Sequence, residues 1–313
     1  MKIFNAISSG FANVIQSKRY IFFAYSLNLL IPLVLGIALF STLSQSIGHS
    51  LAGENLRNGF DELWYPGFSA QAQGLSGTFH PSVVGIGAVF NGLEKMLDGS
   101  FLQANWEVAG VGLLYLLLWT FLSAAFISLY ATPKEQPSFF QRGAEFFPRF
   151  LLLGVIAGVI YFLLFYFVMD WLTKAVDELT RETIDERIHF GYVVLKYLVV
   201  WGLIWTVNLV FDYSKIVMVV KDHKNALSAP LVAMRLVFSN FGKMYGLYLS
   251  IGVVWIVMML FYWLIAPGAG QSNWITIIGA FVVGQIYLLA RIATRCLFYA
   301  GQTSMFTAIS PKG

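Results

Sequence analysis

The sequence predicts an all-α, polytopic helical membrane protein with six transmembrane helices, both termini in the cytoplasm, and amphipathic helices at the membrane interface. Three observations predict this fold class. Apolar residues make up 58% of the chain and charged residues 12%, whereas soluble domains are about a quarter charged. Six stretches of 22–26 mostly apolar residues are each long enough to cross ~30 Å of hydrocarbon as a helix. The segments between these stretches alternate in the sign of their charge.

The apolar stretches define the expected spans, which together form one integral membrane domain over residues 1–313. We place them at about 21–44, 106–131, 150–172, 190–211, 244–266 and 275–299. The first stretch is longer than the apolar core of a signal peptide, so we expect it to be a retained span. It contains Asn28 and Pro32, and a proline in the middle of a span frees a backbone carbonyl.

The charges of the connecting segments predict the orientation. One family of segments holds 14 of the 20 Lys and Arg residues and 4 of the 16 Asp and Glu residues: 1–20, 132–149, 212–243 and 291–313. The remaining segments hold 6 basic and 12 acidic residues. Because basic loops stay on the cytoplasmic side, both termini are expected there, in contact with anionic lipid of the bilayer. No basic groove or stacking motif accompanies these charges, so nucleic acid is not an expected partner.

Two connecting segments are expected to form amphipathic helices on the cytoplasmic surface. Residues 1–19 place Phe4 and Phe11 among apolar residues that recur at helical spacing. Residues 225–243 have Ser228 as the expected N-cap, followed by Pro230 in the first turn. Residues 132–149, with three prolines, are expected to be a cytoplasmic loop.

The outer side is expected to carry one long segment, residues 45–105, with turn signals in its first half. Trp64 and Tyr65 are the expected interfacial anchors of this half. The second half, from His80 on, carries apolar residues on one helical face and predicts an amphipathic helix. Residues 174–189 are strongly charged and predict a continuation of the neighbouring helices beyond the bilayer.

Catalytic motifs are missing from the sequence: there is no phosphate-binding glycine loop, no HExxH and no GxSxG. The four histidines are scattered, and no pair has the spacing of metal ligands on a helix. The sole cysteine, Cys296, excludes a disulfide within the chain. We therefore assign no catalytic, cofactor-binding or metal-binding residue, and no cofactor.

Polar residues inside the spans are the better functional signal, because charge in a membrane is costly and tends to be retained for a role. Asn208, Asp212 and Lys215 share one helix face near the cytoplasmic end of the fourth span. Arg291 and Arg295 lie one turn apart at a similar depth in the sixth, so a pairing with Asp212 is expected.

A second pair is expected near the outer surface, between Asp170 and Lys196. Two alternatives remain open for these residues and for the cytoplasmic cluster: ion pairs that only fix helix packing, or a transport role. A GxxxG element, Gly154 to Gly158, predicts close helix approach in the third span.

One resemblance is carried by two runs of residues, Phe211 to Ile216 and Phe241 to Tyr248. With the amphipathic segment between them, these runs resemble poorly characterised bacterial multi-spanning inner-membrane proteins. They are also similar in style to the membrane domain attached to some glycerophosphodiester phosphodiesterases. The resemblance covers about 40 residues and implies a bacterial inner-membrane location. It transfers no catalytic residue, because the hydrolase part has no counterpart here.

The sequence thus favours a non-enzymatic membrane subunit or scaffold of a bacterial inner-membrane complex, which binds a membrane-protein partner or a second copy. The alternative is the membrane component of a permease or transporter, with or without a separate ATPase. Six spans and cytoplasmic helices are compatible with that alternative, but paired helix breaks at the membrane midplane are lacking. An intramembrane enzyme acting on lipid ranks last, because no nucleophile–base pair is present.

Overall fold

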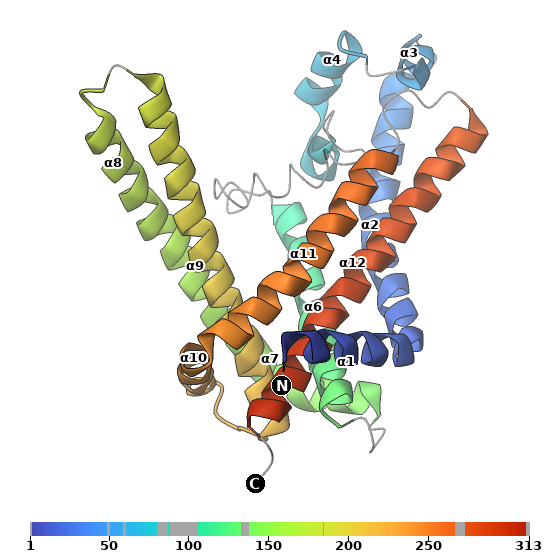
Figure 1. Cartoon of the computed structure of the whole chain (residues 1–313). Helices are drawn as coiled ribbons and strands as arrows, with labels where there is room; N and C mark the ends of the chain where they lie inside the picture. The colour runs from blue at the N-terminus through green and yellow to red at the C-terminus, as the bar shows by residue number, and fades with distance from the viewer. Residues whose placement is uncertain are drawn as a thin grey trace. The chain divides into compact units, whose positions relative to one another are not determined.

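The computed structural model describes residues 2–48, 51–58, 61–79, 87, 106–132, 138–183, 185–266 and 273–310. Every secondary-structure element in those ranges is helical (Figure 1). In chain order they are α1 (Ile3–Gln16), α2 (Lys18–Ile47), α3 (Ala52–Asn58), α4 (Trp64–Gln71), the 3₁₀ helix η1 (Gly74–Thr78), α6 (Trp106–Ala131), α7 (Phe139–Leu163), the π-helical turn η4 (Leu164–Val168), α8 (Met169–Thr180), α9 (Glu186–Val220), α10 (Ala229–Ser239), α11 (Phe241–Ile265) and α12 (Trp274–Ile309). Six of these helical stretches are long and apolar enough to cross a membrane, with α7, η4 and α8 forming one of them. The prediction of an all-α, multi-pass membrane protein is therefore confirmed.

Several predicted helix ends agree with the structure. The fourth span continues through Val220, as expected, and the charged segment 174–189 is built from the end of α8 and the start of α9. Asp185 caps α9 by accepting a hydrogen bond from the backbone N–H of Arg187 at 2.9 Å. Ser228 precedes α10 and Pro230 lies in its first turn, but the Ser228 hydroxyl contacts the His223 ring at 2.7 Å instead of capping the helix.

Two stretches outside the predicted spans are helical, and for residues 139–149 the predicted loop is wrong. Residues 139–149, expected to be loop, form the first turns of α7, and Pro148 lies inside this helix. The last helix does not end near Tyr299 but continues to Ile309. Both extensions have the same physical reason: their side chains are buried within the protein, as Phe139 and Phe306 show with 2% and 0% exposure.

The contacts divide the chain into two compact units, where the sequence predicts one domain. Unit 1 consists of Met1–Val14, Leu118–Ile251 and Leu297–Gly313. Unit 2 consists of Ile15–Leu117 and Gly252–Cys296. Each unit is described by itself below.

Unit 1 contains the largest fully buried side chains of the described residues. They come from α6, α7, α9, α11 and α12: Tyr213, Phe126, Phe150, Phe306, Leu122, Ile127, Leu153, Leu209, Ile216, Met218, Met244 and Leu247. Within this unit α8 lies beside α9, and α10 packs against α9 (Figure 1). Burial of these apolar side chains supplies the main stabilisation of the unit.

The N-terminal helix α1 packs on the end of α12 through small residues. A Cβ atom added at Gly10 would lie 3.1 Å from the backbone nitrogen of Gly301, so glycine permits this close approach. Ala6 is fully buried, whereas Phe4 is 78% exposed. The predicted helix over residues 1–19 is therefore present, with its small face on the protein and large apolar side chains outward. Its location at the membrane interface stays a prediction.

Unit 2 contains α2, which continues through Pro32, and the first helices of the long segment 45–105. Trp64 stacks on Phe68 with ring centroids 4.8 Å apart, and the Tyr65 hydroxyl donates to the carbonyl of Phe79 at 3.1 Å. The Tyr65 bond therefore links α4 to the residue that follows η1, whereas the Trp64 stack lies within α4. The amphipathic helix predicted after His80 lies outside the described residues, as do most residues between 80 and 105.

Candidate functional site

Asn208, Asp212 and Lys215 lie along α9 within unit 1, at the spacing that the sequence predicts to share a face. The Lys215 ammonium donates to an Asp212 carboxylate oxygen at 3.4 Å. Their side chains are 25% and 20% exposed, respectively, so this pair is partly shielded from solvent. A partly buried pair is screened less than a surface pair and holds its geometry more firmly.

Two residues from other helices bond to Asn208 and Asp212. The Tyr161 hydroxyl, from α7, donates to the side-chain oxygen of Asn208 at 2.7 Å. The Gln302 side-chain amide, from α12, donates to the second Asp212 carboxylate oxygen at 3.4 Å. We refer to Tyr161, Asn208, Asp212, Lys215 and Gln302 as the polar network. The Tyr161–Asn208 bond links α7 to α9, and the Gln302–Asp212 bond links α9 to α12, all within unit 1.

Sequence reasoning missed Tyr161 and Gln302. Tyr161 stands in an aromatic-rich run that is expected to be bundle core or lipid-facing surface. Gln302 follows the predicted end of the last span, so it is assigned to a cytoplasmic tail. The stretch 300–309 contains no proline, and this lack of a helix-breaking residue is the signal that α12 continues to Gln302.

Three buried polar atoms, on Gln302 of the polar network and on two residues next to its members in the sequence, have no hydrogen-bond partner among the described residues. They are the hydroxyls of Tyr213 and Thr303 and the side-chain carbonyl oxygen of Gln302. These three side chains are at most 1% exposed. Buried polar groups are nearly always satisfied, and exceptions concentrate where a protein is not optimised for stability alone. The polar groups of this region are therefore only partly satisfied by the described residues.

No family model, curated protein or solved structure matches this chain. The function must therefore be argued from the geometry of the chain's own residues.

The predicted pairing of Asp212 with Arg291 or Arg295 joins residues of different units and stays a prediction. Within unit 2, Arg291 is exposed and Arg295 is half-buried. Asp212 obtains its described partners, Lys215 and Gln302, from unit 1.

Asp170 and Lys196 have partners other than the predicted ones. Asp170 pairs with Lys174 at 2.7 Å, one turn further along α8. The Lys196 ammonium donates to the Thr173 hydroxyl at 3.4 Å and lies 4.9 Å from the ring centroid of Tyr197. Both side chains of the Asp170 pair are more than half exposed, and such an i,i+4 pair forms locally with little loss of entropy.

The described residues contain no group of three or more His, Cys, Asp or Glu side chains that could hold a metal ion. His189 contacts the Thr180 hydroxyl at 2.9 Å, and His223 contacts Ser228. Cys296 is buried. His49 and His80 lie outside the described residues.

The GxxxG element of α7 has open surroundings. A Cβ atom added at Gly154 or Gly158 would meet nothing within 4 Å. The close helix approach that the motif predicts is thus not made to any described residue of the chain itself. An open small-residue face on a transmembrane helix is suited to contact with a helix of another chain.

Proposed function

We propose that this protein is a non-enzymatic integral subunit or scaffold of a bacterial inner-membrane complex, and that it binds another membrane protein through its spans. The observation that carries the proposal is the open GxxxG face of α7. Helices associate in lipid mainly through packing and polar contacts, so a face of small residues left open is a natural site for a second protein.

The low burial of the spans supports the same proposal. Only 6% of the residues in the apolar parts of α11 and α12 are buried, against 39% in α6. Large apolar side chains such as Phe261 and Phe281 are 61% and 60% exposed. Lipid or a partner must cover this surface, and a chain that covers so little of its own spans leaves much of them available to a partner.

The inner-membrane location and the orientation rest on sequence. The resemblance carried by Phe211 to Ile216 and Phe241 to Tyr248 suggests a bacterial inner membrane. The basic segments assign both termini to the cytoplasm.

A permease component, with or without a separate ATPase, is the second candidate because of the polar network. A partly buried carboxylate inside a helical membrane protein often belongs to an ion or proton pathway. On that alternative, Asp212→Asn abolishes flux in proteoliposomes while the protein still folds. If Asp212→Asn instead prevents folding, the network is a structural clasp.

The proposal is tested by affinity purification of the tagged chain at native expression in mild detergent. We expect a second membrane protein to co-purify in fixed proportion. Substitution of both Gly154 and Gly158 by leucine should release it, because the leucine side chains occupy the open face, where an added Cβ meets nothing in the chain itself.

Gly202→Leu is the matched control. Gly202 lies in α9 of the same unit, its surroundings are also open, and it is not part of a GxxxG element. The control should retain the partner. A wild-type chain that purifies alone contradicts the proposal, and equal loss with the control contradicts the assignment of the interface.

A further inference from the structure

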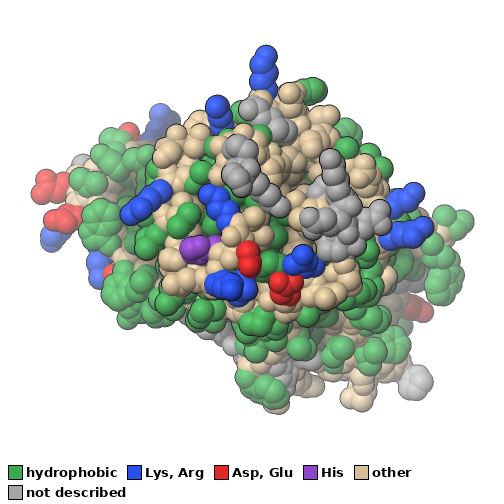
Figure 2. Space-filling model, turned by 90° about the horizontal axis from the view of Figure 1, so that it is seen from below, with side chains coloured by type: hydrophobic (Ala, Val, Ile, Leu, Met, Phe, Trp, Pro, Cys, Tyr) green, Lys and Arg blue, Asp and Glu red, His purple; other side chains and the backbone are tan. Residues whose placement is uncertain are grey.

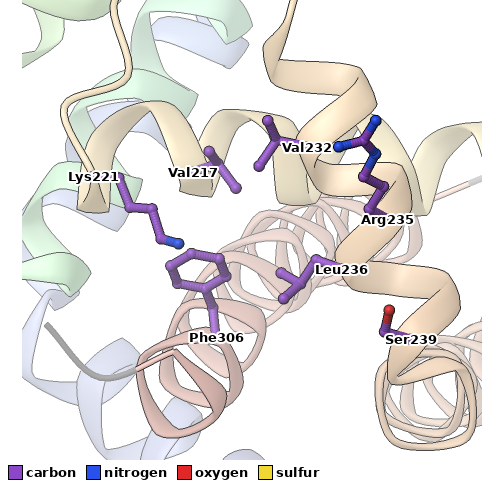
Figure 3. Close-up of a pocket in the computed structure, with 7 residues that line it drawn as sticks. All are labelled: Val217, Lys221, Val232, Arg235, Leu236, Ser239 and Phe306. Atoms are coloured by element: carbon purple, nitrogen blue, oxygen red, sulfur yellow. The ribbon is translucent and has the colours of Figure 1, made fainter. Parts of the chain in front are cut away.

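A hollow of about 290 Å³ opens on unit 1 where the end of α9, the helix α10 and the end of α12 meet (Figure 3). Its lining residues are Val217, Lys221, Val232, Arg235, Leu236, Ser239 and Phe306. This volume lies at the lower end of the range for small-molecule sites. The hollow is separate from the residues of the polar network.

The floor of the hollow is apolar and its rim is cationic. Phe306 and Val217 are 0% and 1% exposed and form the floor, whereas Lys221 and Arg235 are exposed. Figure 3 shows the Lys221 amine pointing toward Phe306, with Arg235 on the opposite side of the hollow. The amine lies 5.8 Å from the centroid of the Phe306 ring.

The carboxylate that follows Lys221 in the sequence is paired with another residue. Asp222, the residue after Lys221, has a left-handed backbone with φ of 44°, and the N–H of His223 donates to the carbonyl of Met218 at 3.1 Å. This is the hydrogen bond of a Schellman motif, with aspartate where glycine is usual. Asp222 then accepts a hydrogen bond from Arg149 at 2.8 Å.

Lys221 and Arg235 consequently form no salt bridge with any carboxylate in the described part of the chain. Two unpaired cations on one rim attract a multiply charged anion, and phosphate oxygens accept several charge-assisted hydrogen bonds at once. In Figure 2, which views the protein from below, Lys and Arg side chains are spread over the visible face and Asp and Glu side chains are few.

The surface beside the hollow favours a ligand with an apolar part. Leu231, Met234 and Phe238 of α10 are 57%, 41% and 57% exposed. An acyl chain could lie along these side chains while its headgroup occupies the rim. Basic pockets beside transmembrane helices bind anionic lipid headgroups by this combination.

We propose that this hollow binds a phosphate group through Lys221 and Arg235, and that the phosphate belongs to an anionic phospholipid. Free phosphate shares the chemistry of the headgroup but lacks the acyl chains that contact α10. The hollow is therefore a defined lipid site of unit 1, beyond the general attraction of basic loops to the bilayer. It does not depend on the proposed partner protein.

The test measures binding to the full-length protein in a neutral detergent, by native mass spectrometry and by titration. Three probes are compared: a short-chain phosphatidylglycerol, a phosphatidylcholine with the same acyl chains, and inorganic phosphate. We expect phosphatidylglycerol to bind most tightly. If inorganic phosphate binds as tightly as phosphatidylglycerol, the assignment to a lipid is overturned.

Variants separate the hollow from general surface charge. The double variant of Lys221→Gln and Arg235→Gln should bind phosphatidylglycerol about 25-fold more weakly. Each cation near a membrane surface contributes about fivefold to the binding of an anionic lipid, and two cations are removed. Lys224→Gln removes one charge from the same loop outside the hollow, and should bind like the wild type. Equal losses for Lys221→Gln and Lys224→Gln, or tight binding by the double variant, overturn the proposal.

Because both substituted side chains are exposed, we expect the melting temperature of the double variant to equal that of the wild type. This measurement serves as the control that the double variant folds. Co-purification of a partner with this variant should also be unaffected, because the open face of Gly154 and Gly158 lies on α7. Failure of the lipid site can therefore be distinguished from failure of the proposed subunit function.

Discussion

Two tyrosines of unit 1 differ in whether their hydroxyl group has a hydrogen-bond partner. The Tyr161 hydroxyl donates to Asn208 at 2.7 Å, whereas the buried Tyr213 hydroxyl has no hydrogen-bond partner in the described part of the chain. Substitution by phenylalanine removes one oxygen from each and leaves the ring in place. We predict that the two substitutions change the free energy of unfolding in opposite directions.

The magnitudes follow from the surroundings of each hydroxyl. A buried polar group without a partner costs about 1–3 kcal/mol, so Tyr213→Phe should stabilise the protein by about 1 kcal/mol. A hydrogen bond between membrane helices contributes about 0.6–1.7 kcal/mol, so Tyr161→Phe should destabilise it by about 1 kcal/mol. The two variants should then differ by about 2 kcal/mol, which is about 30-fold in the unfolding equilibrium constant.

The assay is reversible unfolding of the purified protein in mixed micelles, followed by tryptophan fluorescence, with each variant measured beside the wild type. Neither substitution removes a tryptophan, so the signal is comparable. The reasoning is refuted if Tyr213→Phe destabilises the protein as much as Tyr161→Phe does. In that case the Tyr213 hydroxyl stabilises the native structure.

Three other predictions concern packing, pH and orientation. Gly10→Leu should destabilise unit 1 by about 1–3 kcal/mol, because the new side chain meets the backbone of α12. Gly154→Leu should not destabilise it, because an added Cβ there meets nothing. Thermal unfolding measures both variants, and equal losses of stability contradict the packing of α1 on α12. The hydrogen bond from Arg149 holds the pKa of the Asp222 carboxyl below its ordinary value of 3.8. The pair therefore stabilises the folded state above pH 3.8, and this stabilisation is lost as the pH falls through the lowered pKa. Asp222→Asn should remove that part of the pH dependence of the melting temperature, and an unchanged profile contradicts it. Because residue 224 is assigned to the cytoplasmic side, Lys224→Cys should react with an impermeant maleimide only after cells are opened. The native cysteine is buried and should give no background, and labelling of intact cells contradicts the cytoplasmic assignment.

The spans could be predicted from the sequence because an apolar stretch of more than twenty residues has one main physical interpretation. Hydropathy does not predict the helical segments that lie outside the apolar stretches. Residues 139–149 and 300–309 are helical because side chains such as Phe146 and Met305 are buried in unit 1. Burial of this kind depends on tertiary contacts, which a hydropathy pattern does not contain.

In the candidate site, the residues on one helix could be predicted from the sequence and their partners on other helices could not. Asn208, Asp212 and Lys215 were predictable because one helix and its 3.6-residue period place them together. Tyr161 and Gln302 come from two other helices, and the sequence alone gives no measure of their distance from α9. Asp170 and Lys196 bond to Lys174 and Thr173, which lie one turn along the same helix and on the neighbouring helix.

Native mass spectrometry of the chain purified at native expression tests the central claim most directly. The chain alone has a mass of 35.0 kDa. We predict a heavier species that contains another membrane protein and that dissociates when Gly154 and Gly158 are both replaced by leucine. A lone chain of 35.0 kDa in every mild detergent, or copies of this chain with no other protein, contradicts the claim that it is a subunit of a larger membrane complex.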